Sequence, residues 1–232
     1  MMKRKTVIFD FDDTLVQSYP LFLHYEALFL DEMEKLGFGE REEIRGFLRQ
    51  RDIALVTEAG YPAIDCFPKA IRETYQHFCD KQGLTPDEQI GARLEKQAWQ
   101  VHYDRSEPVP GAKEVLEALQ GRLPLLVFSQ GEEQSQLRRI RESGFASYFF
   151  ASRVVPSKTL AAFEQLIADY DIDAASSWMI GNSLRADVKP ALAAGLNVIH
   201  YDTHDWAFEQ AEVLGHYHRV QRLTDILEIL LS

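Results

Sequence analysis

The sequence predicts an α/β fold in which a doubly wound parallel sheet is interrupted by an inserted all-helical domain. Short apolar runs alternate with amphipathic helical patterns at the start of the chain and again from residue 108 onward, which is typical of a parallel sheet covered on both faces. Between these parts the apolar periodicity is helical throughout, and a Pro-rich connector at 107–111 marks the return. We therefore expect an α/β core of residues 1–16 and 108–232 and a helical domain of residues 17–107.

The candidate strands are short runs rich in β-branched and aromatic residues, which favour extended structure. They are Lys5–Phe9, Leu125–Phe128, Trp178–Ile180 and Asn197–Tyr201. The first run ends directly in acidic residues, as expected of a buried strand whose carboxyl end carries chemistry. Helical apolar patterns lie between these runs, at residues 115–119, 137–140, 160–167 and 188–192. We expect these helices to cover the sheet.

The helical insert contains four apolar patterns with helical spacing. They cover Leu21–Leu36, Glu40–Val56, Pro68–Gln82 and Asp87–Tyr103. Glycine-containing breaks at residues 37–39 and 60–62 separate the first three. Thr85, Pro86 and Glu88 have the spacing of an N-cap, a first helical residue and a capping-box partner, so we expect Thr85 to cap the last helix.

Composition and charge exclude several classes of partner. The 232 residues include 25 Lys and Arg against 36 Asp and Glu, a formal net charge of −11. Because nucleic acids and anionic membranes attract clustered cations, we expect neither as a partner. The first apolar run breaks at Asp10, too early for a signal peptide or a membrane span. Cys66 and Cys79 form no CxxC pattern and suit a reducing compartment, so we expect a cytoplasmic protein with two buried thiols.

Four short polar segments lie at the ends of predicted strands. They are DFDDTLV at 10–16, SQG at 129–131, SK at 157–158 and GNSLRAD at 181–187. The carboxyl ends of the strands of a doubly wound sheet form one crevice. We therefore expect these segments to converge although they are far apart in the sequence.

Asp10 and Asp12 are two residues apart, so both carboxylates can reach the crevice once the chain begins to turn. Two like charges close together in a dry site are unfavourable unless a cation is present. Mg²⁺ is a hard ion that prefers oxygen ligands, and Asn182 or Asp187 could supply a further oxygen. The spacing therefore predicts a divalent metal site.

Lys158 and Ser129 complete a site suited to a phosphate group. Lys158 contributes a positive charge, while the Ser129 hydroxyl and the amides of its loop, which includes Gln130, can donate hydrogen bonds to oxyanions. One carboxylate beside a bound phosphate can act as a nucleophile, and a second can act as an acid and a base.

These segments resemble the ordered motifs of the haloacid dehalogenase-like hydrolase superfamily. DFDDTLV resembles the first motif, DxDxT/V, while Ser129 and Lys158 match the second and third. GNSLRADVKPALAAG resembles the fourth, usually written GD-S-x-x-x-D. The match is spread over residues 5–16 and 108–201, and the helical insert resembles the family's C1 cap. The resemblance implies a Rossmann-like core with a helical cap domain.

The resemblance also implies a role for each residue. Asp10 would attack phosphorus and become an aspartyl-phosphate. Asp12 would protonate the leaving group and later activate water. Ser129, Gln130 and Lys158 would bind the phosphate.

For the metal, the resemblance implies oxygen ligands from the first and fourth motifs. The candidates are Asp10, Asp12, Asn182 and Asp187. The sequence departs from the family pattern at Asn182, which takes the place of the first acid of the fourth motif. Either Asn182 ligates Mg²⁺ directly while Asp187 acts through water or orients Lys158, or Asp187 itself moves into direct contact with the metal.

We expect a Mg²⁺-dependent phosphatase that acts on a small phosphorylated metabolite, as a monomer or homodimer, with the helical insert as a lid. Dehalogenases and phosphonatases of this superfamily typically lack an acid at the position of Asp12, which argues against both. A phosphomutase shares the four motifs and is one alternative. A non-catalytic member that binds a phosphorylated ligand or a partner is the other, because Asn182 replaces the usual acid.

Arg41, Arg45 and Arg49 lie four residues apart and form a basic stripe on one predicted helix. Glu42 and Glu43 are their neighbours, and a run of charges on a helix is usually a solvated face. That interpretation is favoured. Contact with a second anionic group of the substrate is the alternative.

Overall fold

The computed structural model describes residues 3–203 and 211–231. The chain forms two compact units. Met1–Tyr19 and Arg105–Ser232 form one, here called the core unit, and Pro20–Asp104 form the other, the helical unit. No helix in the described part of the chain is long and apolar enough to cross a membrane.

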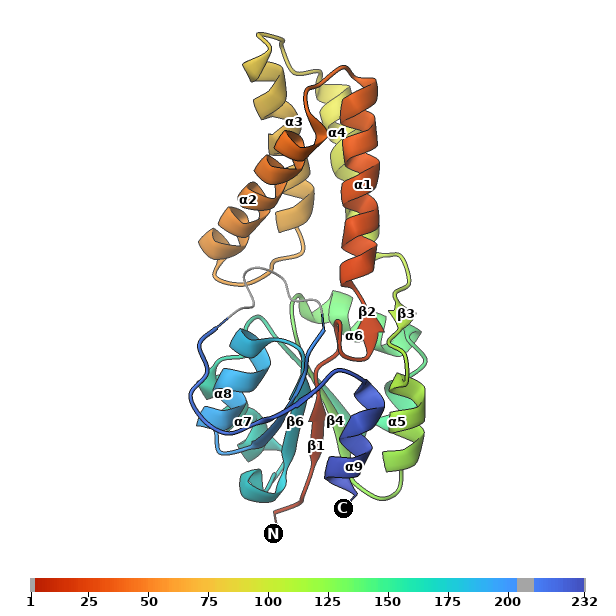
Figure 1. Cartoon of the computed structure of the whole chain (residues 1–232), viewed down its shortest axis with the longest axis vertical. Coiled ribbons are helices and arrows are strands. Elements are labelled where there is room, and N and C mark those ends of the chain that lie inside the picture. Colours follow the sequence, from red (N-terminus) through yellow and green to blue (C-terminus); the bar gives the residue numbers. More distant parts are fainter. Residues whose placement is uncertain (1–2, 204–210, 232) are drawn as a thin grey trace. The chain divides into compact units, whose positions relative to one another are not determined.

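The core unit contains a six-stranded sheet in which each neighbouring pair of strands is parallel (Figure 1). Its strands are β1 (Val7–Phe9), β4 (Leu125–Gln130), β5 (Ala151–Val155), β6 (Trp178–Gly181), β7 (Asn197–Tyr201) and β8 (His218–Val220). Their order in space is β5-β4-β1-β6-β7-β8, so the first strand is central. Phe9 pairs with Val127 on one side and with Ile180 on the other. The predicted doubly wound α/β fold is confirmed.

Alternate residues of β1 enter two separate hydrophobic cores, because successive side chains of a strand point to opposite faces of the sheet. One core includes Val7 and Phe9, and the other includes Ile8. The helices packed on the first face are α5 (Ala112–Leu119), α6 (Glu133–Glu142) and α9 (Ile226–Leu230), and those on the second are α7 (Leu160–Asp169) and α8 (Lys189–Ala193). Helices thus cover both faces of the sheet (Figure 1).

Two strands of the six-stranded sheet, β5 and β8, lie outside the runs that the sequence predicts. Both are edge strands. Arg153 in the middle of β5 is exposed and forms an ion pair with Asp169 at 3.7 Å. Edge strands commonly carry charged side chains, which discourage pairing with other chains and also break the apolar pattern of a strand.

The helical unit is built from α1 (Tyr19–Lys35), α2 (Arg41–Ala59), α3 (Cys66–Lys81) and α4 (Glu88–Trp99), followed by a 3₁₀ turn at Gln100–His102. These helices share one apolar core, to which each contributes large side chains. Its members include Phe29, Met33, Ile44, Leu48, Ile71, Phe78 and Leu94. Cys66 and Cys79 are both buried and free.

The start of α4 corrects one prediction. Asp87, not Thr85, is the N-cap, and its side chain accepts hydrogen bonds from the backbone amides of Gln89 and Ile90. The backbone N–H of Asp87 donates to the Tyr75 hydroxyl at 3.0 Å. With Thr85 as the N-cap, the Asp87 N–H is one that the cap side chain would accept from, and Tyr75 takes that hydrogen bond instead, so the helix begins later than its local pattern predicts.

The Arg41, Arg45 and Arg49 stripe is a set of interhelical ion pairs rather than a simple solvated face. Arg45 and Arg49 both donate to the carboxylate of Glu26 on α1, at 3.1 Å and 2.8 Å. Arg41 donates to Asp31 on the same helix at 2.7 Å. The spacing of the stripe therefore joins α2 to α1 and needs no substrate to explain it.

Candidate active site

The loop that follows β1 turns sharply and carries the first acidic motif. The backbone N–H of Asp10 donates to the Ile180 carbonyl at 2.8 Å, which extends the pairing of β1 with β6 by one residue. Asp13 then adopts φ 56°, a left-handed conformation in which Asp is one of the tolerated residues. Its buried carboxylate accepts hydrogen bonds from the amides of Ser18 and Tyr19, both at 2.8 Å. Asp13 therefore fixes the loop and the first turn of α1.

The ends of this loop are held by a small antiparallel ribbon. β2 (Val16–Gln17) pairs with β3 (Glu107–Pro108). The backbone N–H of Val109 donates to the Leu15 carbonyl at 2.9 Å. The chain segments that leave and re-enter the core unit are thus joined beside the loop.

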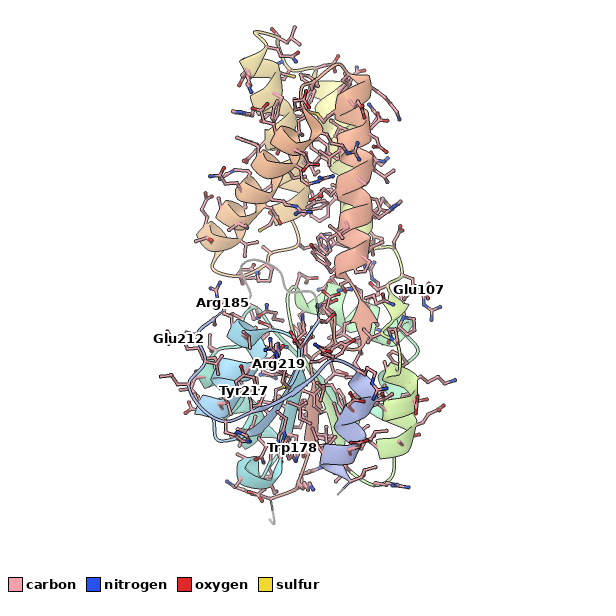
Figure 2. All side chains as sticks on the ribbon, in the orientation of Figure 1. Glu107, Trp178, Arg185, Glu212, Tyr217 and Arg219 are labelled. Carbon is pink, nitrogen blue, oxygen red and sulfur yellow. The ribbon has the colours of Figure 1, made fainter. Side chains whose placement is uncertain are left out.

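The polar residues lie at the carboxyl ends of the strands. In Figure 2, Trp178 marks the amino end of β6 and Arg185 lies beyond its carboxyl end. The four polar segments lie at the carboxyl ends of β1, β4, β5 and β6, on the side of the sheet where Arg185 lies. Three of them meet around Asp10, and two meet around Asp12.

Asp10 is held by two donors. Its Oδ1 accepts a hydrogen bond from Lys158 Nζ at 2.5 Å, and its Oδ2 accepts one from Thr14 Oγ1 at 3.1 Å. Asp10 is 6% exposed and Lys158 is 3% exposed. Lys158 follows β5 closely, so the topology brings together two residues that are 148 positions apart.

Asp187 is the second partner of Lys158. Its Oδ1 accepts from Lys158 Nζ at 2.6 Å, and its Oδ2 accepts from the amide of Ser183 at 3.0 Å. The side chain lies in a π-helical turn, Leu184–Val188, directly against β6. A Cβ at Gly181 would lie 2.3 Å from the Asp187 carboxyl, so glycine is required there for this approach.

Asn182 lies between these groups and the loop. Its Oδ1 is 3.4 Å from Thr14 Oγ1, the same hydroxyl that contacts Asp10. Its backbone carbonyl accepts a hydrogen bond from Nε2 of His200, a fully buried residue of β7, at 2.8 Å. Oxygens of Asp10 and Asn182 therefore face one hydroxyl, which has a single proton to donate.

Burial and charge set the protonation of this group, here called the Asp10 cluster (Asp10, Thr14, Lys158, Asn182 and Asp187). Burial raises the pKa of Asp10 to about 7, because Lys158 only partly opposes burial and the Asp187 charge adds to it. Burial alone would lower the pKa of Lys158, but the two carboxylates outweigh it and hold that pKa above its ordinary value. The cluster therefore combines a stable ammonium with an acid that is poorly stabilised as an anion.

Asp12 has different partners, although it is only two residues from Asp10. Its Oδ1 accepts from Arg139 Nη2 at 2.6 Å and from the Ser18 hydroxyl, and its Oδ2 accepts from Gln136 Nε2 at 2.5 Å. Burial would raise the pKa of Asp12, but Arg139, Ser18 and Gln136 together hold it below its ordinary value. The two carboxylates thus occupy different environments.

Ser129 and Gln130 end β4, and Ser129 connects to the Asp12 side of the site. The Ser129 hydroxyl accepts from Gln136 Nε2 at 2.8 Å. The backbone carbonyl of Gln130 accepts from the same amide at 3.1 Å. Ser129 is a strand residue and does not cap α6. Glu132 caps that helix, with its side chain accepting from the amides of Gln134 and Ser135.

The sequence singled out seven site residues, and the structure sorts them into two groups. Asp10, Lys158, Asn182 and Asp187 belong to one group, and Asp12, Ser129 and Gln130 to the other. Contributors outside that set include Asp13, Thr14, Ser18, Gln136, Arg139 and His200. Gln136 and Arg139 are three residues apart on α6 and share a face, but polar residues at this spacing are also typical of a solvated helix.

The fold family implies a Mg²⁺ ion, and the donors present fit it in part. Among the described residues, no group of three or more His, Cys, Asp or Glu side chains is arranged to hold a metal. Asp10 and Asn182 nevertheless present neighbouring oxygens that share one donor, and such hard oxygens suit Mg²⁺. The Asp12 carboxylate is paired with Arg139, and its place among the metal ligands stays a prediction.

The core unit is thus a doubly wound sheet with a buried carboxylate, a lysine and a second carboxylate at the carboxyl ends of its strands. A family model for haloacid dehalogenase-like hydrolases matches residues 4–195, so the chain belongs to that family. The predicted membership of this superfamily is thereby confirmed.

Two relatives match most of the chain. It is 26% identical over 208 residues to the ribulose-1,5-bisphosphate 5-phosphatase of Halopiger xanaduensis, covering 84% of each protein. It is 23% identical over 240 residues to the putative HAD-hydrolase YfnB of Bacillus subtilis, covering 99% of this chain and 97% of YfnB.

Solved structures share the fold. A haloacid dehalogenase-like family hydrolase from Xanthomonas campestris matches with a TM-score of 0.79 at 23% identity, over 99% of this chain and 97% of the other. YfnB bound to magnesium matches with a TM-score of 0.68 at 21% identity, over 99% and 100%. The L-2-haloacid dehalogenase of Xanthobacter autotrophicus matches with a TM-score of 0.64 at 19% identity, over 100% and 99%.

Proposed function

We propose that this protein is a Mg²⁺-dependent phosphatase that hydrolyses a small phosphorylated metabolite through an aspartyl-phosphate on Asp10. The observation that carries the proposal is the contrast between two acids of one loop. Asp10 is buried between Lys158 and Thr14, and Asp12 is paired with Arg139. Two carboxylates in different environments can take two different roles in one reaction.

Asp10 and Asn182 would hold Mg²⁺, and Asp187 would orient Lys158. Asp10 Oδ2 and Asn182 Oδ1 meet at the Thr14 hydroxyl, whereas the Asp187 oxygens accept from Lys158 Nζ and the Ser183 amide, which favours this assignment over direct ligation by Asp187. When bound, the metal supplies positive charge to the phosphate oxygens. Lys158 supplies the same kind of stabilisation from the protein, and the magnesium bound to YfnB supports the choice of ion.

In the first half-reaction, a carboxylate oxygen of Asp10 attacks phosphorus. The bond from phosphorus to the ester oxygen breaks, and its electron pair leaves with that oxygen. Asp12, whose ionised form Arg139, Ser18 and Gln136 favour, must first take up a proton from solvent; that proton then passes to the departing oxygen, which releases a neutral alcohol. The products are an aspartyl-phosphate on Asp10, the alcohol and ionised Asp12.

In the second half-reaction, water attacks the phosphorus of the aspartyl-phosphate, and the Asp12 carboxylate accepts a proton from that water. The bond from phosphorus to the Asp10 oxygen breaks, which restores the Asp10 carboxylate and releases inorganic phosphate. Asp12 is protonated again and ready for the next turnover.

The presence of an acid at Asp12 favours ester hydrolysis over dehalogenation, since displacing a halide requires no proton donor. The relative named as a ribulose-1,5-bisphosphate 5-phosphatase supports the same assignment. Phosphomutase activity predicts a rearranged sugar phosphate instead of free phosphate, so product analysis separates the two.

The test is a Mg²⁺ titration of phosphate release from p-nitrophenyl phosphate and a panel of small phosphomonoesters. We expect metal-dependent turnover that Asp10→Asn abolishes, and a covalent phosphoenzyme that acid quenching traps in the native protein. Asp80→Asn makes the same chemical change at an exposed position and should leave the rate unchanged. If the native protein shows no metal-dependent turnover while Asn182→Asp does, a phospholigand-binding role replaces the phosphatase.

A further inference from the structure

Arg139 is the centre of a polar network that the proposed reaction does not by itself require. Its Nη2 contacts Asp12 Oδ1 at 2.6 Å, Ser18 Oγ at 2.8 Å and Ser106 Oγ at 3.2 Å. Its Nη1 donates to Gln136 Oε1 at 2.7 Å. Its guanidinium carbon lies 5.6 Å from the centroid of the Phe11 ring.

The two ends of the Gln136 side-chain amide bind different members of the network, which fixes the orientation of the amide. Because its Oε1 accepts from Arg139, its Nε2 must face the opposite side, where it donates to Asp12 Oδ2 at 2.5 Å and lies 2.8 Å from Ser129 Oγ. A Cβ at Gly131 would lie only 3.1 Å from Gln136 Cγ, so the loop after β4 leaves little freedom for this side chain. Gln136 therefore fixes one carboxylate oxygen of Asp12 and Arg139 fixes the other.

The network differs from an ordinary surface ion pair. The Arg139 side chain is 16% exposed, and its fork contacts groups from three separate segments of the core unit. Surface pairs lose most of their energy to solvent and side-chain entropy, whereas a guanidinium with several fixed acceptors is held in one orientation. Ser18 and Ser106 lie on the two segments that pass between the units, beside β2 and β3, so Arg139 also ties the Asp12 loop to both of them.

We propose that Arg139, braced by Gln136, is a positioning residue that aims the Asp12 carboxyl group for proton transfer to the leaving group. The proposal rests on the proposed phosphatase function. Arg139 itself touches no reacting atom. The charge of Arg139 favours the ionised form of Asp12, so its contribution to the acid step is orientation alone, which matters in proportion to how much the departing oxygen needs a proton.

That dependence gives a readout which a purely structural role would not change. An alkoxide is a poor leaving group and needs the proton of Asp12, whereas p-nitrophenolate is already stable and does not. A misdirected Asp12 should therefore lower kcat/KM for an alkyl phosphate much more than for p-nitrophenyl phosphate. The parameter kcat/KM is chosen because it reports the steps up to departure of the leaving group.

The experiment compares Arg139→Met, Arg139→Lys and Arg141→Met with the native protein on glycerol phosphate and p-nitrophenyl phosphate at saturating Mg²⁺. We expect Arg139→Met to lose about 10–100-fold in kcat/KM on glycerol phosphate and less than about 3-fold on p-nitrophenyl phosphate. A general acid contributes about 10²–10⁴-fold to the rate, and a misdirected acid should lose part of that contribution. Arg139→Lys keeps the charge but not the planar guanidinium, so its kcat/KM on glycerol phosphate should lie between the values of the native protein and Arg139→Met. Arg141 is exposed on the same helix, so Arg141→Met is the matched control and should match the native protein.

Equal losses on both substrates, in either Arg139 variant, would show that the residue supports the fold or binds phosphate, and would overturn the proposal. Undiminished activity on glycerol phosphate would overturn it as well. Arg139→Lys keeps the test valid if a thermal melt shows that Arg139→Met does not fold. Absence of turnover by the native protein on either substrate is a separate result, because it refutes the phosphatase function itself.

Discussion

Gly181→Ala should destabilise the protein through one contact. Gly181 ends β6, and a Cβ placed on it would lie 2.3 Å from both Cγ and Oδ2 of Asp187. Gly181 does not have a positive φ angle, so alanine can adopt its backbone conformation without strain. The whole effect of the substitution should come from crowding against Asp187.

The size of the effect follows from the surroundings of Asp187. Ordinary contact begins at 3.4 Å, so the carboxyl group must retreat from 2.3 Å by about 1.1 Å. Asp187 is fully buried and holds Lys158 Nζ at 2.6 Å. Overpacking a core site costs about 1–3 kcal/mol, and breaking a buried ion pair costs about 3–5 kcal/mol. We expect the free energy of unfolding to fall by about 2–5 kcal/mol, with the proposed phosphatase activity reduced by about 10²-fold.

Urea unfolding followed by circular dichroism measures this change. Gly46→Ala is the matched control, because Gly46 lies inside α2 and the added Cβ would meet no side chain or other part of the chain within 4 Å apart from the neighbouring helix backbone. Alanine there should raise the free energy of unfolding by about 0.5–1 kcal/mol. If Gly181→Ala unfolds within about 0.5 kcal/mol of the native protein, Asp187 does not pack against residue 181 and the reasoning fails.

Three further predictions concern the metal, the pH dependence of stability and the acid. Asn182→Asp should bind Mg²⁺ more tightly than the native protein and Asp187→Ala should lose most activity, both measured by Mg²⁺ titration. Burial, with the charge of Glu26, raises the pKa of Asp52 to about 6, so its contribution to stability is present near pH 4 and is lost as pH rises through 6. Urea unfolding should therefore find Asp52→Asn about 1–3 kcal/mol more stable than the native protein at pH 7.5, with the difference vanishing near pH 4. Asp12→Asn should lose about 10²–10⁴-fold on alkyl phosphates while still releasing p-nitrophenolate, and equal loss on both would contradict its role as the acid.

The fold class was predictable because apolar runs and the acids that follow them can be identified within a few neighbouring residues of the sequence. Asp10 directly follows a buried apolar run. Lys158 and Asp187 are the last residues of the SK and GNSLRAD segments, which resemble family motifs. The edge strands were not predictable, since β5 contains Arg153 and its pairing depends on β4 rather than on its own sequence. Thr85 failed as a cap for a similar reason, because a tertiary hydrogen bond decided where the helix begins.

The hydrogen-bond partners of Asp12 also could not be predicted from the sequence. Gln136 and Arg139 lie on a helix whose composition is strongly polar, and such a helix gives no sign that one face is turned inward. Their partner Asp12 lies more than 120 positions away, so only the assembled sheet brings them together. The place of Asp12 among the metal ligands stays a prediction, because a sequence does not show which cation a carboxylate meets.

The central position of β1 has a consequence for how the protein is made. Val7, Ile8 and Phe9 are fully buried and hydrogen-bonded to strands that begin at residues 125 and 178, so the first strand synthesised must wait for partners made much later. Contacts across such long separations are slow to form. The helical unit draws its core from residues 20–104 and has all its partners before β4 leaves the ribosome. We therefore expect a nascent chain that matures from the middle outward, with an early period in which β1 is a target for chaperones and the active site is the last feature to appear.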